Sequence, residues 1–491
     1  MRILYIDIDS LRPDHLGCYG YHRDTSPNID RLATQGIRFE NCYVSDSPCL
    51  PSRTALFSGR FGFRTGVVNH GGTAAQPFVE GPDRGFSDEF GQTSWMTALR
   101  QQGYRTAAVS SFGERHGAWH WYAGFNDTFN SGGKGNEIAE EVTPLALDWL
   151  DRSADDENWF LYINYWDAHL HYRTPLGFGN PFDDVPMADW PTQEYLEQSQ
   201  MGCGMRCAQD ALGLGWGTPT DLEDSLKYPR MPDQLKTADD IKTWHDGYDT
   251  AIRYVDTHIG MILDRLETLG VLDETVIMIS ADHGEHLGEL NVWGGHHMAD
   301  HWINRVPLIV RWPGKSPGVD RALHYQFDWA ATLIELTGGT VPDNWDGESF
   351  AEVFQQGEES GRDYLVLSHA CMTAQRAVRF DDYICVRSYH DGYKLLDPVM
   401  LFNMANDPHE LYNLADEESE IAAQAAHYLT EWQQQMMLTS PSTVDPMMTV
   451  LREGGPYHSR GKLPAYLDRL RTSGRTESAE ALFKRHGYGS Q

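Results

Sequence analysis

Residues 49–60 of this 491-residue chain read Cys-Leu-Pro-Ser-Arg-Thr-Ala-Leu-Phe-Ser-Gly-Arg. Pro51 suits the first turn of a helix, because the N–H group that proline lacks would have no partner there. Cys49 would then lie at a helix N-terminus, where exposed N–H groups and the positive end of the dipole favour a bound sulfate or phosphate. Arg53, one turn further on, can add a charge-assisted contact. We therefore expect an anion-binding site at Cys49.

The same stretch resembles the signature at which sulfatases convert a cysteine to formylglycine. Cys49, Pro51, Arg53, Gly59 and Arg60 match that signature, with hydroxyl residues at 52 and 58. The resemblance implies that Cys49 becomes an aldehyde and hydrates to a diol. One hydroxyl then attacks the sulfur of a sulfate ester, and the other later expels the sulfate. The alternative is a buried structural cysteine before a helix, since free cysteine is commonly buried.

Strand-like and helical patterns alternate through the first two thirds of the chain. Residues 2–8 are rich in Ile, Leu and Tyr, which is typical of a buried strand in a parallel sheet. Similar apolar runs lie at 106–109, 159–163, 275–279 and 306–310, and helical patterns lie at 29–35, 95–102 and 248–269. The alternation predicts an α/β fold with a doubly wound, mostly parallel sheet between layers of helices. The sulfatase resemblance implies the alkaline-phosphatase-like form of that fold.

The chain is longer than one hydrophobic core usually supports, so we expect a large domain with a smaller companion. Residues 1–355 are predicted to form the catalytic domain, and residues 356–491 a C-terminal α+β subdomain. The subdomain would hold a helix over 419–436 and an antiparallel sheet of short strands, at 377–380, 383–386, 393–396 and 401–404. Residues 175–242 lack a sustained period and predict an irregular insertion near the active site, or else a plain surface loop.

The formal net charge of −32 favours solubility and argues against nucleic acid or an anionic membrane surface as a partner. An anionic substrate would then need local arginines, histidines and a metal ion to reverse the field in its pocket. Seven cysteines, an odd number in a long chain, do not indicate a disulfide framework. No leader segment or apolar run of membrane length is visible, so we expect a cytoplasmic protein.

Two segments place hard metal ligands where predicted strands end, at the edge of an open α/β sheet that binds ligands. Asp9 follows the first strand, and Asp282 and His283 follow a later one. Both segments resemble sulfatase metal segments, which implies that Asp9, Asp282, His283 and the modified Cys49 bind a divalent metal. Calcium is favoured by the family, with manganese, magnesium or zinc left open, and strand-end capping is the alternative role. Many sulfatases carry a second acid where this chain has Ser10.

Residues 167–175, beginning Asp-Ala-His-Leu-His, resemble the sulfatase Asp-Pro-His segment. The resemblance implies that His169 holds a sulfate oxygen or the leaving group. His171 stands where the family often has proline. It is therefore a candidate substrate contact, or else an exposed histidine without a role in the reaction.

Residues 293–297, Trp-Gly-Gly-His-His, resemble a sulfatase Trp-Gly-Lys-His segment. His296 matches the histidine of that segment, Gly295 replaces its lysine, and His297 is a further candidate substrate contact. The lysine normally touches the sulfate and the ester oxygen. Protonation of the leaving group would therefore fall to His296, His169 or a different cation.

Residues 109–116, Val-Ser-Ser-Phe-Gly-Glu-Arg-His, occupy the place of a third sulfate-binding segment without matching its Gly-Lys-Trp-His pattern. His116 is the candidate base that deprotonates the remaining diol hydroxyl, and Arg115 is a candidate anion contact. A structural ion pair between Arg115 and Glu114 or another acid is the alternative.

The resemblance covers most of the chain and implies a sulfatase that hydrolyses a sulfate ester with formylglycine and a divalent metal. Fifteen Trp and 23 Tyr residues permit stacking on sugars, which favours a sulfated carbohydrate over an aryl sulfate. The alternatives are a phosphonate monoester or phosphodiester hydrolase on the same scaffold, a simple arylsulfatase, and a non-catalytic binder of sulfated glycans. The expected partners are a sulfated small molecule or saccharide and a formylglycine-generating or anaerobic maturation enzyme. Whether the protein forms a homo-oligomer is left open.

Overall fold

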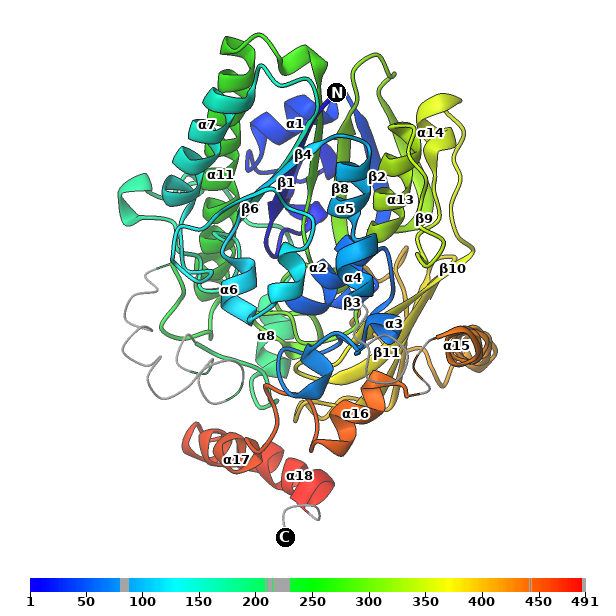
Figure 1. Cartoon of the computed structure of the whole chain (residues 1–491). Coiled ribbons are helices and arrows are strands. Elements are labelled where there is room, and N and C mark those ends of the chain that lie inside the picture. The colour runs from blue at the N-terminus through cyan, green and yellow to red at the C-terminus, as the bar shows by residue number, and fades with distance from the viewer. Residues whose placement is uncertain are drawn as a thin grey trace.

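The computed structural model describes residues 1–79, 88–207, 210, 214, 230–440, 442 and 444–487. A large mixed sheet lies between helices at its centre, and a smaller sheet lies towards one end (Figure 1). Within the insertion expected over 175–242, residues 208–209, 211–213 and 215–229 lie outside the described part of the chain.

The central sheet has eight strands among the described residues, and every neighbouring pair is parallel except the two pairs that β8 makes with β7 and β2. In sheet order the strands are β5 (Asp127–Phe129), β4 (Arg105–Val109), β6 (Trp159–Tyr165), β1 (Arg2–Ile8), β7 (Thr275–Ser280), β8 (Arg305–Arg311), β2 (Ile37–Tyr43) and β9 (Gly318–Tyr325). The predicted α/β class and all five predicted strands are confirmed. The run at 306–310 is β8, which runs against its neighbours.

The loops that follow three adjacent parallel strands, β6, β1 and β7, begin at the same edge of the central sheet. The three strands are buried almost throughout, which explains why their sequences are apolar without alternation. Asp7 of β1 lies beside Asn164 of β6 and beside Ser280 of β7. The loops that carry Asp9 and Asp282 therefore start at the same edge of the sheet.

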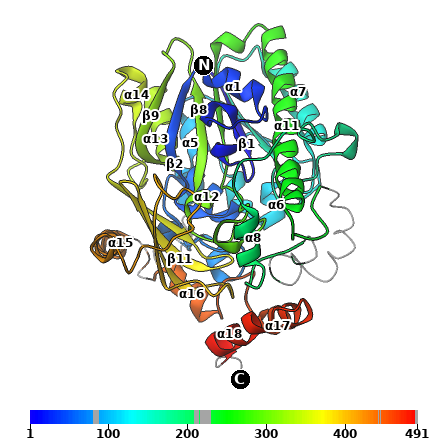
Figure 2. The same cartoon turned by 180° about the vertical axis from the view of Figure 1, so that it is seen from behind.

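Helices cover both faces of the central sheet (Figures 1 and 2). On one side lie α1 (Pro27–Ala33), α7 (Ala139–Ser153) and α11 (Ala238–Thr268). On the other side α5 (Trp95–Gln101) and α13 (Gln326–Leu336) pack together with α2 (Cys49–Ser58). The helices predicted at 29–35, 95–102 and 248–269 are confirmed as α1, α5 and α11, although α11 begins at Ala238. The shorter helices are α3 (Gly62–Thr65), α4 (Glu89–Thr93), α6 (Phe112–His116), α8 (Gln193–Ser199), α12 (His301–Asn304) and α14 (Ala351–Gln355).

The second sheet joins C-terminal strands to a short N-terminal one. In sheet order its strands are β13 (Val399–Asn403), β12 (Tyr383–His390), β11 (Ala374–Phe380), β10 (Tyr364–His369) and β3 (Asp46–Ser47). β3 pairs parallel with β10, so that Ser47 lies beside His369. Because β3 leads directly into α2, the C-terminal sheet supports the start of the helix that carries Cys49.

The prediction of a strand at 393–396 is wrong. These residues form a turn in which Tyr393 and Leu395 have φ angles of 65° and 58°. That left-handed backbone cannot continue an extended strand. The alternation of apolar residues in this stretch comes instead from Tyr393 and Leu396, which point into the core from the turn.

Four helices follow the second sheet in the part of the chain that the structure describes. They are α15 (Ser419–Thr439), α16 (Pro446–Arg452), α17 (Leu463–Thr472) and α18 (Thr476–His486). The predicted helix over 419–436 is confirmed as α15, which packs against β11. α17 and α18 lie beyond the second sheet (Figure 2). There, Arg475 donates to the carbonyl of Gly204 (2.5 Å) and Arg469 pairs with Asp210 (2.5 Å). Among the helices described, none is both long and apolar enough to span a bilayer.

Candidate active site

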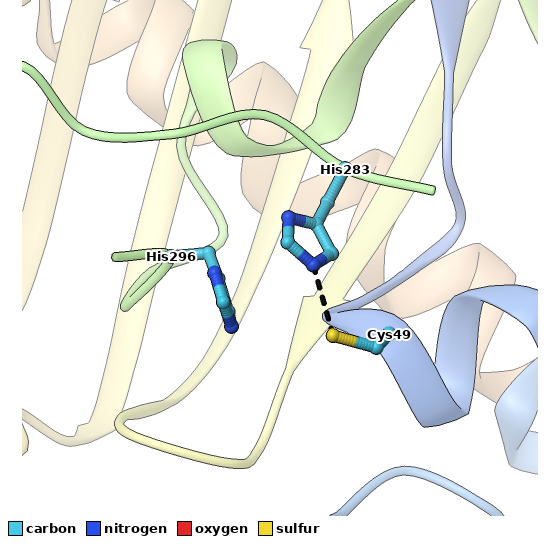
Figure 3. Close-up of side chains that lie close together, drawn as sticks. All are labelled: Cys49, His283 and His296. Atoms are coloured by element: carbon cyan, nitrogen blue, oxygen red, sulfur yellow. Dashed lines mark hydrogen bonds between the residues drawn. The ribbon is translucent and has the colours of Figure 1, made fainter. Parts of the chain in front are cut away.

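Cys49 is the first residue of α2, and its side chain is 1% exposed. Its Sγ lies 3.1 Å from Nε2 of His283, which comes from the loop after β7, and His296 stands next to that pair (Figure 3). Pro51 lies in the first turn of the helix. The reactive position of the signature therefore sits at a helix N-terminus, where the backbone dipole favours an anion.

Gly59 ends the signature helix. It has a φ angle of 65°, and its N–H donates to the carbonyl of Ala55. A Cβ atom at this position would lie 2.3 Å from the ring of Trp345. Both the left-handed backbone and the close packing of Trp345 therefore require glycine at this position of the signature.

Four donor groups lie close enough to hold one cation. The donor atoms of Asp9, Cys49, Asp282 and His283 all lie within 4.8 Å of one another, and the four residues are buried. Nε2 of His283 is 3.3 Å from Oδ2 of Asp282 and 3.8 Å from Oδ1 of Asp9. Two carboxylates and an imidazole are ligands that divalent cations accept, so the residues present fit a metal ion.

One guanidinium faces three buried carboxylates in this site. Arg53 donates from Nη1 to Oδ2 of Asp9 (3.1 Å) and of Asp282 (2.5 Å), and from Nε to Oδ2 of Asp7 (3.0 Å). Burial, together with the charges of Asp9 and Asp7, raises the pKa of Asp282 well above its ordinary value. Carboxylate charge thus exceeds guanidinium charge in a dry site, and a divalent cation would balance the excess.

Ser10 connects the two carboxylates of this donor set. Its hydroxyl donates to Oδ1 of Asp9 (3.0 Å), and its backbone N–H donates to Oδ1 of Asp282 (3.2 Å). The residue has a φ angle of 62°, a conformation that few non-glycine residues adopt. Where many sulfatases place a second acid, this chain therefore orients Asp9 and Asp282 with a neutral residue.

The environment of Cys49 does not favour thiolate chemistry. Burial, with Asp9 and Asp282 close by, raises the pKa of the Cys49 thiol well above its ordinary value. Cysteine nucleophiles instead sit in surroundings that lower this pKa. An unmodified thiol at this position would stay protonated near neutral pH, so the site suits a side chain of different chemistry at residue 49.

Three imidazoles gather next to Cys49. The ring centroids of His283 and His296 are 4.0 Å apart, and that of His169 lies 5.1 Å from His296 and 6.5 Å from His283. Burial lowers the pKa of His169 to about 3 and that of His283 to about 4. Because their pKa values lie well below 7, these rings are neutral near pH 7, and each offers one donor and one acceptor nitrogen.

A second pair of imidazoles also approaches Cys49. Nitrogen atoms of His70 and His116 and the Sγ of Cys49 lie within 4.8 Å of one another, and the two rings are 4.6 Å apart. Burial and the charge of Arg115 lower the pKa of His116. The structure thus brings His116 to the reactive residue, and it brings His70 there as well.

Arg115 lies beside this group without a carboxylate partner among its described contacts. Its Nη1 donates to the carbonyls of Lys134 (3.1 Å) and Gly135 (3.3 Å), and its guanidinium lies 5.1 Å from the ring centre of Trp166. Glu114 forms its salt bridge with Lys134 (3.3 Å). The charge of Arg115 is therefore available to a nearby anion.

The remaining two candidates are His171 and His297. His171 is partly exposed, and burial with the charges of Arg173 and His169 lowers its pKa. His297 is buried, with its ring 6.2 Å from that of His286 and its carbonyl accepting from Thr373 Oγ1 (2.9 Å). His297 therefore lies between the loop after β7, which carries His286, and the turn between β10 and β11, which carries Thr373.

The structure adds residues to the site that the sequence did not indicate. His70 follows α3 on a glycine-rich loop, His458 lies near the C-terminus, and their Nδ1 and Nε2 atoms are 3.0 Å apart. Glu285 lies behind His296, with Oε2 3.9 Å from its Nδ1. The histidine before Gly71-Gly72 was a signal for His70, but nothing local marked His458.

Family comparison agrees with this geometry. The family model described as "Sulfatase" matches residues 2–339, and the model described as "N-sulphoglucosamine sulphohydrolase, C-terminal" matches residues 288–435. The first range includes all candidate site residues proposed from the sequence, from Asp9 to His297. The second range spans the strands of the second sheet from β10 to β13.

Two curated proteins are similar to the chain over most of its length. The N-acetylglucosamine-6-O-sulfatase of Bacteroides thetaiotaomicron is 23% identical over 481 residues, covering 84% of this chain and 82% of that protein. The arylsulfatase of Hemicentrotus pulcherrimus is 25% identical over 461 residues, covering 82% of this chain and 76% of that protein.

Solved structures share the fold. A protein in complex with its substrate D-glucosamine-2-N,6-O-disulfate has a TM-score of 0.67 and 20% identity, covering 90% of this chain and 99% of that chain. The phosphonate monoester hydrolase of Agrobacterium radiobacter has a TM-score of 0.65 and 18% identity, covering 89% and 96%. The signature helix and the buried carboxylates agree with the family match. The chain belongs to the sulfatase family of sulfuric ester hydrolases.

Proposed function

We propose that this enzyme hydrolyses a sulfate ester on a carbohydrate, with formylglycine formed from Cys49 as its nucleophile. The observation that carries the proposal is the juxtaposition of residue 49, at the N-terminus of α2, with Asp9, Asp282 and His283. The carbohydrate class is supported by the N-acetylglucosamine-6-O-sulfatase relative and by the fold neighbour bound to a sulfated glucosamine.

In this proposal Asp9, Asp282, His283 and residue 49 would hold a divalent cation, calcium first and manganese, magnesium or zinc as alternatives, which would supply Lewis-acid polarisation of the sulfate oxygens. Arg53 orients the two carboxylates through Nη1 and adds positive charge beneath the helix N-terminus. The excess carboxylate charge around Arg53 supports this assignment of the cation site.

The imidazoles divide the proton transfers between them. His169 and His296, whose rings are 5.1 Å apart, are assigned to the leaving-group oxygen, because Gly295 provides no ammonium group there. His116, close to residue 49, is assigned to the base that deprotonates the second hydroxyl before sulfate is expelled. Neutral imidazoles can serve in either direction, since each has a donor and an acceptor nitrogen.

The substrate side of the site is assigned to Arg115, His171 and His297. Arg115 supplies a guanidinium whose described hydrogen bonds go to backbone carbonyls, and so it can attract the anionic ester in a protein of net charge −32. The described part of the insertion at 175–242 is proposed to shape the pocket for the remainder of the substrate.

A second candidate is a phosphonate monoester or phosphodiester hydrolase. It is favoured by the fold likeness to the Agrobacterium radiobacter enzyme and to the phosphonate monoester hydrolase of Silicibacter pomeroyi, which has a TM-score of 0.66. A simple arylsulfatase is supported by the Hemicentrotus pulcherrimus relative. The three candidates share the nucleophile and differ in the ester that they hydrolyse fastest.

The first test is the mass of the proteolytic peptide that contains Cys49, from protein produced together with a formylglycine-generating enzyme. We expect the aldehyde, and a fully unmodified thiol would overturn the mechanism. The converted protein is then assayed on matched sulfate, phosphate and phosphonate esters of one sugar and one phenol. Asp282→Asn is expected to abolish turnover, and turnover equal to that of the unchanged protein would contradict the cation site.

A further inference from the structure

The C-terminal segment 454–462 packs against the loop that carries His70. The N–H of His458 donates to the carbonyl of Cys371 (3.0 Å), and the Ser459 hydroxyl donates to the carbonyl of Met372 (2.5 Å). A Cβ atom on Gly71 would lie 2.3 Å from the ring of Tyr457, so this ring covers the loop closely. The segment is therefore anchored on both sides, between the second sheet and the loop after α3.

Two hydrogen bonds of His70 fit one tautomer of its ring. Nε2 accepts the backbone N–H of Leu50 (3.5 Å), so this nitrogen carries a lone pair. The hydrogen of the neutral ring is then on Nδ1, which donates to Nε2 of His458 at 3.0 Å. With the hydrogen of His70 on Nδ1, Nε2 of His458 is the acceptor of this hydrogen bond, and the backbone bond to Cys371 anchors the residue that carries the ring.

His70 lies close to Cys49 and to the first turn of α2. Leu50 is the neighbour of Cys49 in α2, and a nitrogen of His70 belongs to the group that lies within 4.8 Å of the Cys49 Sγ. A hydroxyl at residue 49 would share the Nε2 lone pair of His70 with the N–H of Leu50, whose contact with that nitrogen is long at 3.5 Å. His116, whose ring is 4.6 Å from that of His70, lies in the same group.

We propose that His458 is a positioning residue of the active site: by accepting the Nδ1–H of His70, it keeps Nε2 of His70 turned towards residue 49 as a hydrogen-bond acceptor. The proposal rests on the proposed function, because it requires a hydroxyl-bearing side chain at residue 49. Through His458, segment 454–462 would then contribute to the function of the active site. His458 lies beyond both ranges matched by the family models, which end at residues 339 and 435.

The kinetic test compares His458→Ala with His458→Gln in protein whose residue 49 has been converted. The glutamine Oε1 can accept the Nδ1–H of His70, and alanine cannot. We expect His458→Ala to lower kcat roughly 10- to 100-fold with KM nearly unchanged, the range for loss of an outer partner that orients a functional histidine. His458→Gln should recover most of that loss. His427→Ala, on the exposed face of α15, is the control and should change neither constant.

Equal losses in His458→Ala and His458→Gln would overturn the proposal, because packing alone would then explain the effect. An unchanged kcat in His458→Ala would overturn it as well. Thermal unfolding of both variants identifies any general loss of fold, and the glutamine variant provides the comparison within the same cavity.

A spectroscopic test does not depend on turnover. In protein labelled with ¹⁵N-histidine, the His70 signals are identified by their loss in His70→Asn. We expect a protonated Nδ1 on His70 in the unchanged protein and a shift towards the other tautomer in His458→Ala. A protonated Nε2 on His70 in the unchanged protein would overturn the proposed role of His458. An unchanged His70 tautomer in His458→Ala would overturn it as well. If converted protein hydrolyses no sulfate ester, the proposed function fails, while this measurement still decides the role of His458.

Discussion

Nη1 of Arg53 lies 2.5 Å from Oδ2 of Asp282, so the signature helix is tied directly to the end of β7 across 229 positions of sequence. The same guanidinium contacts Asp7 and Asp9 at the end of β1. The helix that carries the proposed nucleophile and the residues proposed to hold a cation are thus joined by one buried charge network. A change in Arg53 should affect stability and metal dependence together.

Replacement of Arg53 by Met should therefore be costly. It leaves the carboxylates of Asp7, Asp9 and Asp282 buried without their guanidinium partner, a loss of about 3–5 kcal/mol in the free energy of unfolding. The measurement is urea unfolding in the presence of a chelator, and saturating calcium should recover part of the loss by neutralising the same carboxylates. Activity should be lost under both conditions.

Arg152→Met is the matched control for that experiment. Arg152 pairs with Asp148 on the surface of α7, where both side chains are more than half exposed. Exposed pairs of this spacing contribute only about 0.3–0.5 kcal/mol. Similar losses in the two variants, or a loss in Arg53→Met that calcium does not alter, would contradict a charge-balanced cation site.

Replacement of Ser10 by Asp should strengthen metal binding. Asp tolerates the left-handed backbone of this position better than most residues, and it adds carboxylate charge next to Asp9 and Asp282. Without metal, this like charge should destabilise the fold. With calcium the affinity should rise by about tenfold, or ~1.4 kcal/mol. Calorimetric titration measures the affinity, Ser10→Ala is the comparison, and weaker binding by Ser10→Asp would count against the site.

Gly59 offers a separate test of the signature helix. Gly59→Ala places a Cβ 2.3 Å from the Trp345 ring in addition to the strain of a φ angle of 65°. Strain costs about 1–2 kcal/mol and overpacking a further 1–3 kcal/mol. Gly270→Ala has a φ angle of 71° with open space around it, so only strain should appear. Denaturant unfolding of the two variants should separate these costs, and equal values would show that Trp345 yields without penalty.

The buried thiol predicts the behaviour of unconverted protein. Because burial and the neighbouring Asp9 and Asp282 raise the pKa of Cys49, its thiol should remain protonated at pH 8, where an ordinary cysteine is partly ionised. Iodoacetamide should therefore leave Cys49 unmodified in native protein and label it after unfolding in urea. The peptide mass reads the result, and rapid labelling of the native protein at pH 8 would show that the thiolate is accessible.

Local patterns predicted much of the fold because their causes act within a few residues. Apolar runs identified β1, β4, β6, β7 and β8, and Pro51 indicated the first turn of α2. The turn at Tyr393 shows the limit of this reasoning. Its apolar residues are buried by the core around them, while the φ angle that breaks the strand has no signal in the pattern.

The sequence by itself determined the signature, the helix that presents it, and the acids that follow buried strands, since each depends on neighbouring residues. Only the tertiary structure decided that β8 runs against its neighbours, that β3 joins the C-terminal sheet, and that His458 reaches His70. These last two histidines are 388 positions apart. Contacts over such separations depend on how whole elements pack, because the burial of apolar surface determines that packing. The short segments that come into contact have no sequence pattern that indicates their partner.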